Sequence, residues 1–207
     1  MKVLAIAALA TVTIAQNAEI EERKFGHLYN MVWSKVQSKT DFETRDFKSM
    51  IRNYGCYCLP IGGGKNTAQA GVPVDDTDKA CRDLSRCYKC LDIDFDHNAE
   101  AEQFQWSETT NGEFDCSDSR NTNAQKAHCA CDAEFAMTLG ANWDDASYNF
   151  ANWENRRNDF YTLDKEAVCV VQNGGRSDEC CGDYPMRFPF PGTMLECCSD
   201  GNARLTC

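Results

Sequence analysis

The stretch Tyr54–Tyr88 constrains the fold more than any other part of the chain. It opens with a Cys-x-Cys, continues through a run of three glycines, and closes with a Cys-x5-Cys followed by tyrosine. Its second half and the residues just after it carry apolar side chains three and four positions apart, at Cys81, Leu84, Cys87, Tyr88 and Leu91. This spacing predicts a helix that begins near Val74, with both cysteines facing inward. Asp75 or Asp76 should cap or line its first turn, where a carboxylate favours the helix dipole.

The chain has 14 cysteines, and its first residues indicate that it is exported. A charged start and a short apolar run precede the small residue Ala15, a pattern typical of a secretory signal peptide and too short for a membrane-spanning helix. Cysteines in an oxidising compartment form disulfides, and His27, His97 and His128 do not follow a zinc spacing. We therefore expect a secreted, extracellular, disulfide-bonded protein without a transmembrane segment.

Composition and cysteine clustering divide the chain into four expected segments. These are a signal peptide (1–15), a main domain (16–140), an aromatic-rich connector (141–168) and a Cys-rich disulfide module (169–207). The last segment is loop-rich and could close on itself with three bridges.

Periodicity and turn chemistry predict three further elements in the main domain. Apolar residues at helical spacing predict an amphipathic helix from Phe25 to about Val36. Asn111-Gly112 lies between β-forming residues, which indicates a hairpin. A second long helix is expected over residues 121–139, with Gly140 as its C-cap.

These motifs resemble those of the secreted phospholipase A2 family. The Cys-x-Cys, Pro-Val-Asp-Asp and Cys-x5-Cys-Tyr of Tyr54–Tyr88 are similar to that family's signature, and Cys129–Ala136 resembles its helical motif CxCDxxxA. The resemblance extends over roughly Phe25 to Gly140. It implies a mainly α, disulfide-rich fold, with a phospholipase A2-like core of two long antiparallel helices, an N-terminal helix and a small β-wing. The loop-rich, Cys-rich tail would follow this core.

The positions that carry the family's chemistry are changed in this chain. The family uses a histidine as general base on a water, and a neighbouring aspartate with loop carbonyls to hold the calcium that stabilises the oxyanion. When the motif is aligned on Cys81, Cys87 and Tyr88, the histidine position holds Leu84, which cannot take a proton. The aspartate position holds Ser85, a weak calcium ligand. The resemblance therefore predicts no catalytic residue in this chain.

The rest of the family site is only partly present. In the calcium loop, Tyr57 matches a carbonyl donor, but Leu59 and Ile61 stand where the family has glycine. Tyr88 and Asp132 match the pair that orients the catalytic histidine. Without that histidine we expect them to remain as a buried hydrogen-bonded pair, because an unpaired buried carboxylate is costly.

The resemblance also implies the three disulfides Cys58–Cys81, Cys87–Cys131 and Cys116–Cys129. A further family bridge maps to Ala80 and Thr138, so both of its ends are missing together. Losing a bridge typically costs roughly 2–5 kcal/mol, a loss for which the tail could compensate. Cys56 and Cys90 remain, and they could pair with each other or with the tail.

The acidic character of the chain bears on its partners. A net charge of −11 makes nucleic acid an unsuitable partner. Asp92, Asp94 and Asp96 alternate as at the start of an EF-hand, but His97 stands at the glycine position and Gln103 at the glutamate position. We favour a solvated acidic loop, with weak calcium binding as the alternative, and no cofactor is certain.

These inferences predict a secreted, non-catalytic phospholipase A2-like protein that acts by binding. Its ligand would be extracellular protein or matrix, a biomineral, calcium or a lipid. The alternative is a calcium-dependent phospholipase A2-type lipid hydrolase with a rebuilt active site. His97 and His128 are the candidates for a substitute base, but scattered histidines are more often surface or structural groups.

Overall fold

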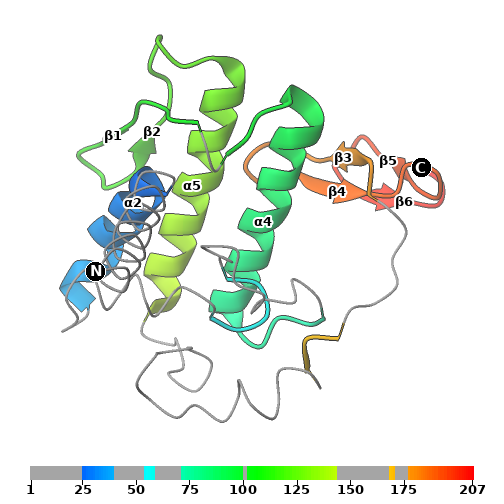
Figure 1. Cartoon of the computed structure of the whole chain (residues 1–207), viewed down its shortest axis with the longest axis horizontal. Helices are drawn as coiled ribbons and strands as arrows, with labels where there is room; N and C mark the ends of the chain where they lie inside the picture. The colour runs from blue at the N-terminus through cyan, green and yellow to red at the C-terminus, as the bar shows by residue number, and fades with distance from the viewer. Residues whose placement is uncertain (1–24, 40–53, 59–70, 100–101, 144–167, 171–176) are drawn as a thin grey trace, which may run out of the picture.

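The computed structural model describes residues 25–39, 54–58, 71–99, 102–143, 168–170 and 177–207. Its centre is a pair of antiparallel helices, α4 (Asp76–Phe95) and α5 (Asn123–Asn142), which pack side by side (Figure 1). A shorter helix, α2 (Gly26–Val36), continues into the 3-10 turn η1 (Gln37–Lys39) and packs on α5. The expected mainly α, disulfide-rich fold is therefore confirmed.

Three two-stranded antiparallel sheets accompany the helices. Their strands are β1 (Ser107–Glu108) with β2 (Phe114–Asp115), β3 (Glu179–Cys181) with β4 (Phe188–Phe190), and β5 (Glu196–Cys197) with β6 (Ala203–Arg204). The first sheet is the predicted wing, and Gly112 in its turn has φ +77°, a conformation that glycine adopts without strain. The other two sheets form the tail, on the α4 side of the helix pair (Figure 1).

The start of α4 is built around the buried carboxylate of Asp78. Asp75 is the N-cap, as the sequence predicted, and its Oδ1 accepts from the Asp78 backbone N–H at 2.8 Å. The Asp78 carboxylate accepts the backbone N–H groups of Cys56, Tyr57 and Val74 at 3.0, 2.8 and 3.0 Å. Gly55 has φ +56°, and a Cβ there would lie 2.3 Å from Asp78 Cγ. One side chain thus holds the Cys-x-Cys segment against the helix.

The helix α5 does not end at Gly140, contrary to the sequence prediction. It begins at Asn123 behind a capping box of Thr122 and Gln125, and it continues to Asn142. A Cβ at Gly140 would lie 2.6 Å from Lys35 Cβ, so the glycine lets α2 approach closely instead of ending the helix. The sequence does not distinguish these two roles, because both place a glycine near the end of a periodic pattern.

Replacing Gly140 with alanine should therefore destabilise the protein by about 1–3 kcal/mol, because the added methyl overpacks the α2–α5 contact. The matched control is Gly26→Ala, where an added Cβ has no atom within 4 Å. Alanine there should be neutral or slightly stabilising, since it has the higher helix propensity. Chemical denaturation of both variants measures the difference, and equal free energies of unfolding would contradict this role for Gly140.

All 14 cysteines are paired, in seven disulfides. The three bridges that the resemblance implied are confirmed. The two undecided cysteines both pair with the tail, as Cys56–Cys169 and Cys90–Cys180. Only two bridges, Cys181–Cys197 and Cys198–Cys207, lie wholly within the tail. The tail therefore does not close on itself with three bridges, because two of its cysteines lie beside the helical core.

The tail also docks on the end of α4 through polar and aromatic contacts. Asp94 accepts a hydrogen bond from the Tyr184 hydroxyl at 2.9 Å and pairs with Arg187 Nε at 2.5 Å. The rings of Phe95 and Tyr184 lie 6.0 Å apart. Together with the Cys90–Cys180 bridge, these contacts give the residues around Arg187 a defined place beside the helix.

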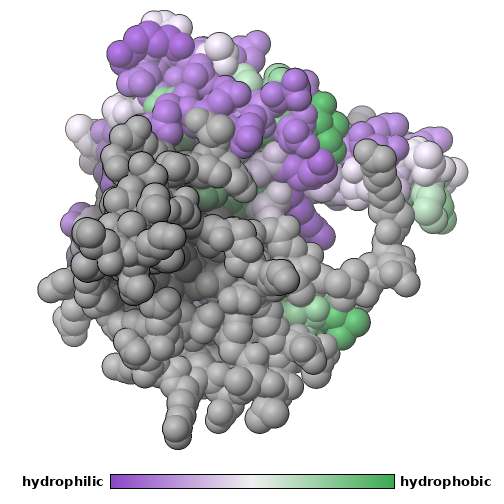
Figure 2. All heavy atoms as spheres, viewed as in Figure 1, coloured by the Kyte–Doolittle hydropathy of each residue, from purple (hydrophilic) through white to green (hydrophobic). Residues whose placement is uncertain are grey.

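Among the described residues seen in Figure 2, hydrophilic side chains gather over the wing and the neighbouring ends of α4 and α5. Small apolar areas remain, such as Val168 and Val170, which are 40% and 52% exposed. In the part of the chain that the structure describes, no helix combines the length and apolar character needed to cross a bilayer. The predicted signal peptide and most of the aromatic-rich connector lie outside the described residues.

Candidate functional site

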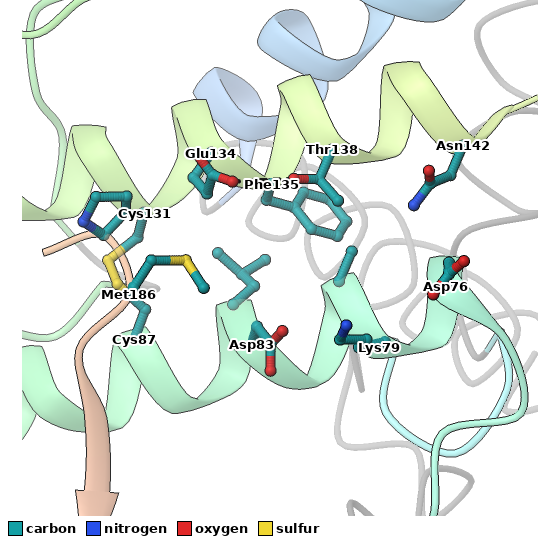
Figure 3. A pocket seen from close by; sticks show the side chains of 13 residues that line it. Asp76, Lys79, Asp83, Cys87, Cys131, Glu134, Phe135, Thr138, Asn142 and Met186 are labelled. Atoms are coloured by element: carbon teal, nitrogen blue, oxygen red, sulfur yellow. Dashed lines mark hydrogen bonds between the residues drawn. A yellow bond between two sulfur atoms is a disulfide. The ribbon is translucent and has the colours of Figure 1, made fainter. Parts of the chain in front are cut away.

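Leu84, which the resemblance places at the position of the family's general base, lies at a hollow between α4 and α5. The hollow has a volume of about 250 Å³, and Leu84 itself is 3% exposed. Apolar side chains line it from both helices (Figure 3), namely Ala80, Leu84, Phe135 and the Cys87–Cys131 disulfide. A leucine in this setting offers packing surface and no proton-accepting atom.

The two positions to which the resemblance assigns the ends of a missing family bridge line this same hollow. Ala80 contributes from α4 and Thr138 from α5. We infer that the space between the two small side chains contributes to the hollow. Met186 extends into it from the tail, between the two helices (Figure 3), and is 61% exposed.

The rim of the hollow is polar. Its polar side chains come from both helices (Figure 3), and they are Asp76, Lys79, Asp83, Glu134, Thr138 and Asn142. An apolar floor with a few polar groups at the rim is the usual composition of a small-molecule site. This hollow can therefore bind an apolar group, but its lining contains none of the three histidines.

The Tyr88–Asp132 pair is confirmed. The Tyr88 hydroxyl donates to Asp132 Oδ1 at 2.5 Å, and the carboxyl is 2% exposed. Burial raises the pKa of Asp132 to about 8, although the hydrogen bond from Tyr88 opposes this rise. The carboxyl is therefore largely neutral near pH 7 in the folded protein.

The histidines are not scattered, which corrects the sequence interpretation. His97 Nε2 lies 3.1 Å from His128 Nδ1, and both side chains are 3% exposed. His97 Nδ1 lies 3.0 Å from Glu102 Oε2, and His128 Nε2 lies 3.8 Å from Asp132 Oδ1. The side chains from Glu102 to Tyr88 thus form one polar row, whose middle members His97, His128 and Asp132 are buried and whose Glu102 end is exposed. Only His128 and Asp132, four positions apart on α5, had a local signal. The contact between His97 and His128 joins separate parts of the chain, so no spacing indicated it.

His27 and Phe104 complete the surroundings of His128. The Phe104 ring stacks near both His27 and His128, with centroid distances of 5.0 and 4.7 Å, and Trp106 Nε1 donates to His27 Nδ1 at 3.1 Å. Burial, together with the nearby His97 and His27, lowers the pKa of His128 to about 3. His128 is therefore a neutral, interior group, which suits a structural role better than that of an accessible base.

The predicted calcium-loop residues are only partly described. The Tyr57 hydroxyl donates to the Gly71 carbonyl at 2.7 Å, and Ser85 is half-buried on α4. Leu59 and Ile61 lie outside the described residues.

The acidic run is the last turn of α4 and not a loop, contrary to the favoured interpretation. Asp92 pairs with Lys89 at 2.9 Å, Asp94 pairs with Arg187, and Asp96 is the C-cap with φ 52°. Within the described ranges, no three His, Cys, Asp or Glu side chains are grouped so that they could hold a metal ion. Weak calcium binding by these aspartates stays a prediction.

Comparison with known proteins shows the family of this chain. The family described as Phospholipase A2 matches residues 31–151. A phospholipase A2 from Bos taurus is 32% identical over 142 residues, which is 66% of this chain and 87% of that protein. The chain therefore belongs to the phospholipase A2 family.

Other relatives are named as homologues of the enzyme. A phospholipase A2 homolog from Echis carinatus sochureki is 31% identical over 103 residues, covering 50% of this chain and 74% of that protein. The acidic phospholipase A2 homolog taipoxin gamma chain from Oxyuranus scutellatus scutellatus is 28% identical over 134 residues, covering 55% of this chain and 80% of that protein. The relatives thus include proteins named as enzymes and proteins named as homologues.

Proposed function

We propose that this chain is a secreted, non-catalytic phospholipase A2-like protein that acts by binding. The observation that carries the proposal is Leu84, a buried leucine at the position of the general base. General-base catalysis needs a proton acceptor within hydrogen-bond reach of the attacking water. The residues around Leu84 supply an apolar floor. Asp132, at the position that the resemblance assigns to the residue orienting the base, accepts a hydrogen bond from Tyr88 instead.

Among the ligands that the sequence suggests, the hollow favours a lipid. Its floor can pack against an alkyl chain, and its rim leaves polar groups for the head of such a molecule. Seven disulfides suit an oxidising, extracellular location, and the start of the chain fits a signal peptide. Extracellular matrix, mineral and calcium remain alternative partners of a non-catalytic protein.

Purified protein should release no fatty acid from phospholipid micelles in millimolar calcium, because removing a general base alone costs about 10²–10⁴-fold in rate. The assay compares it with an active phospholipase A2 of the family and with an EDTA-treated sample. Robust release that EDTA abolishes would instead support the rebuilt calcium-dependent active site.

Binding is tested separately by the shift in melting temperature with a fatty acid or lysolipid. Thr138→Met should fill the hollow and abolish that shift, because Thr138 lies in its lining. Ala141→Met is the matched control, since Ala141 is exposed on the same helix and does not line the hollow. Equal shifts in both variants would exclude this hollow as the lipid site.

A further inference from the structure

A second hollow adjoins the first one and has the opposite electrostatic character. It has a volume of about 280 Å³ and lies between α4 and the tail. The lining consists of Lys79, Arg82, Asp83, Arg86, Pro185, Met186, Arg187 and Phe188. Four of these side chains are cations and one is a carboxylate, although the whole chain has a net charge of −11.

Two separate parts of the chain deliver these cations. Lys79, Arg82 and Arg86 are three, four and seven positions apart on α4, so they lie along one stripe of the helix. Arg187 comes from the tail, where the Cys90–Cys180 bridge and the contacts with Asp94 hold it in place. The tail thus converts one basic stripe into a hollow with cations on two sides.

The neighbouring carboxylates do not fully neutralise the four cations that line this hollow. Asp83 is shared, since Arg82 Nη2 lies 2.9 Å and Arg86 Nη1 lies 4.0 Å from its Oδ1. Asp94 pairs with Arg187, and Lys79 forms no ion pair with any described residue. Asp183 also lies close enough to Arg187 to raise its pKa. Three carboxylates therefore face four cations, which leaves an excess of one positive charge at the hollow.

Arg86 shows the effect of this crowding. Burial and the neighbouring Arg82 both lower its pKa, against the opposing effect of Asp83. A bound anion would relieve the repulsion between the two guanidinium groups. Their planar donor forks match the oxygens of a phosphate or sulfate, and a lysine adds a point charge.

We propose that this hollow is a binding site for a tetrahedral oxyanion, that is, a phosphate or sulfate group. Lys79, Arg82 and Arg86 bind it from α4, and Arg187 binds it from the tail. Met186 and Phe188 form an apolar wall for the part of the ligand that bears the anion. The site does not depend on whether the adjoining hollow binds lipid, or on whether the protein hydrolyses it.

Calorimetric titration of the full-length secreted protein with inorganic phosphate and inorganic sulfate tests the proposal. Arg86→Gln and Lys79→Gln should each weaken binding by about ten-fold, the effect of one lost charge-assisted contact. Asp83→Asn should strengthen binding several-fold, because it removes the only carboxylate among the described residues that line the hollow. Lys89→Gln is the matched control, since it removes the same charge from an exposed site on the same helix.

A sulfated oligosaccharide and a phosphate-headed lysolipid, titrated in the same way, distinguish the sources of the oxyanion. The probe that binds with the higher affinity identifies the class of the larger ligand. This holds provided that Arg86→Gln weakens the binding of that probe and Lys89→Gln does not. Absence of binding by all four probes would overturn the proposal. An equal loss in Lys89→Gln and Arg86→Gln, or weaker binding by Asp83→Asn, would also overturn it.

Discussion

Replacing Asp132 with asparagine should make the protein lose stability on acidification. In the wild type, Asp132 and His128 together leave the free energy of unfolding nearly independent of pH over the same range. Burial raises the pKa of Asp132 from 3.8 to about 8 and lowers that of His128 from 6.5 to about 3. Between the two unfolded values, unfolding takes one proton from Asp132 and gives one to His128. No net proton is bound, so this pair contributes no slope to the free energy of unfolding.

The sign of each contribution follows from the direction of its shift. The raised pKa of Asp132 gives stability that is fully present below the unfolded value and is lost as the pH rises through about 8. The lowered pKa of His128 gives stability that is present above pH 6.5 and is lost as the pH falls toward about 3. Asp132→Asn removes the first contribution, so its stability should fall by about 1.4 kcal/mol per pH unit on acidification from pH 6.5.

His128→Leu should show the opposite slope. It leaves Asp132 alone, so stability should fall by about 1.4 kcal/mol per pH unit as the pH rises from 4 toward 8. Denaturant unfolding at several pH values gives each curve, and its difference from the wild type removes the contributions of ionisable groups that lie away from this pair. A packing change caused by the substitution shifts the free energy of unfolding equally at every pH. It therefore leaves the slope of that free energy against pH unchanged. Parallel curves for the three proteins would contradict the assigned protonation states.

Replacing Asp78 with alanine should be the most destabilising single change at the start of α4. Three backbone N–H groups lose their acceptor at once. Each buried unsatisfied donor costs about 1–3 kcal/mol, so the loss should reach about 3 kcal/mol or more. This is a large part of the 5–15 kcal/mol that typically separates folded from unfolded protein.

Asp76→Ala is the matched control for that experiment. Asp76 lies two positions away in the first turn of α4 but is exposed, so its loss should cost less than about 1 kcal/mol. Asp78→Asn should fall between the two, since it keeps one acceptor oxygen and turns an amide toward a backbone donor. Chemical denaturation under oxidising conditions measures all three variants. A similar cost for Asp78→Ala and Asp76→Ala would refute the role of the buried carboxylate.

Local pattern explains why much of the helical core could be predicted. The helical spacing around Cys81 and the capping position of Asp75 involve residues within a few positions of each other, so the sequence records them directly. The three family bridges and the Tyr88–Asp132 pair came from the resemblance, because they depend on how two helices face each other. Gly140 was misjudged for a related reason, since its role depends on Lys35 in another helix.

The candidate site divides in the same way. The assignment of Leu84 to the position of the base, and of Ala80 and Thr138 to the ends of a missing bridge, came from the resemblance and stays a prediction. The hollow that these residues line, and the entry of Met186 into it, required the packed helices and the docked tail. The convergence of His97 and His128, 31 positions apart in the sequence, likewise had no local signal.

The sequence alone indicated the family of this protein, its long helices and three of its disulfides. Only the tertiary structure decided that Cys56 and Cys90 pair with the tail, across sequence separations of 113 and 90. It also decided that Arg187 joins the basic stripe of α4. The physical reason is that periodicity and capping act between near neighbours, whereas these contacts depend on which surfaces remain to be covered once the helices have packed.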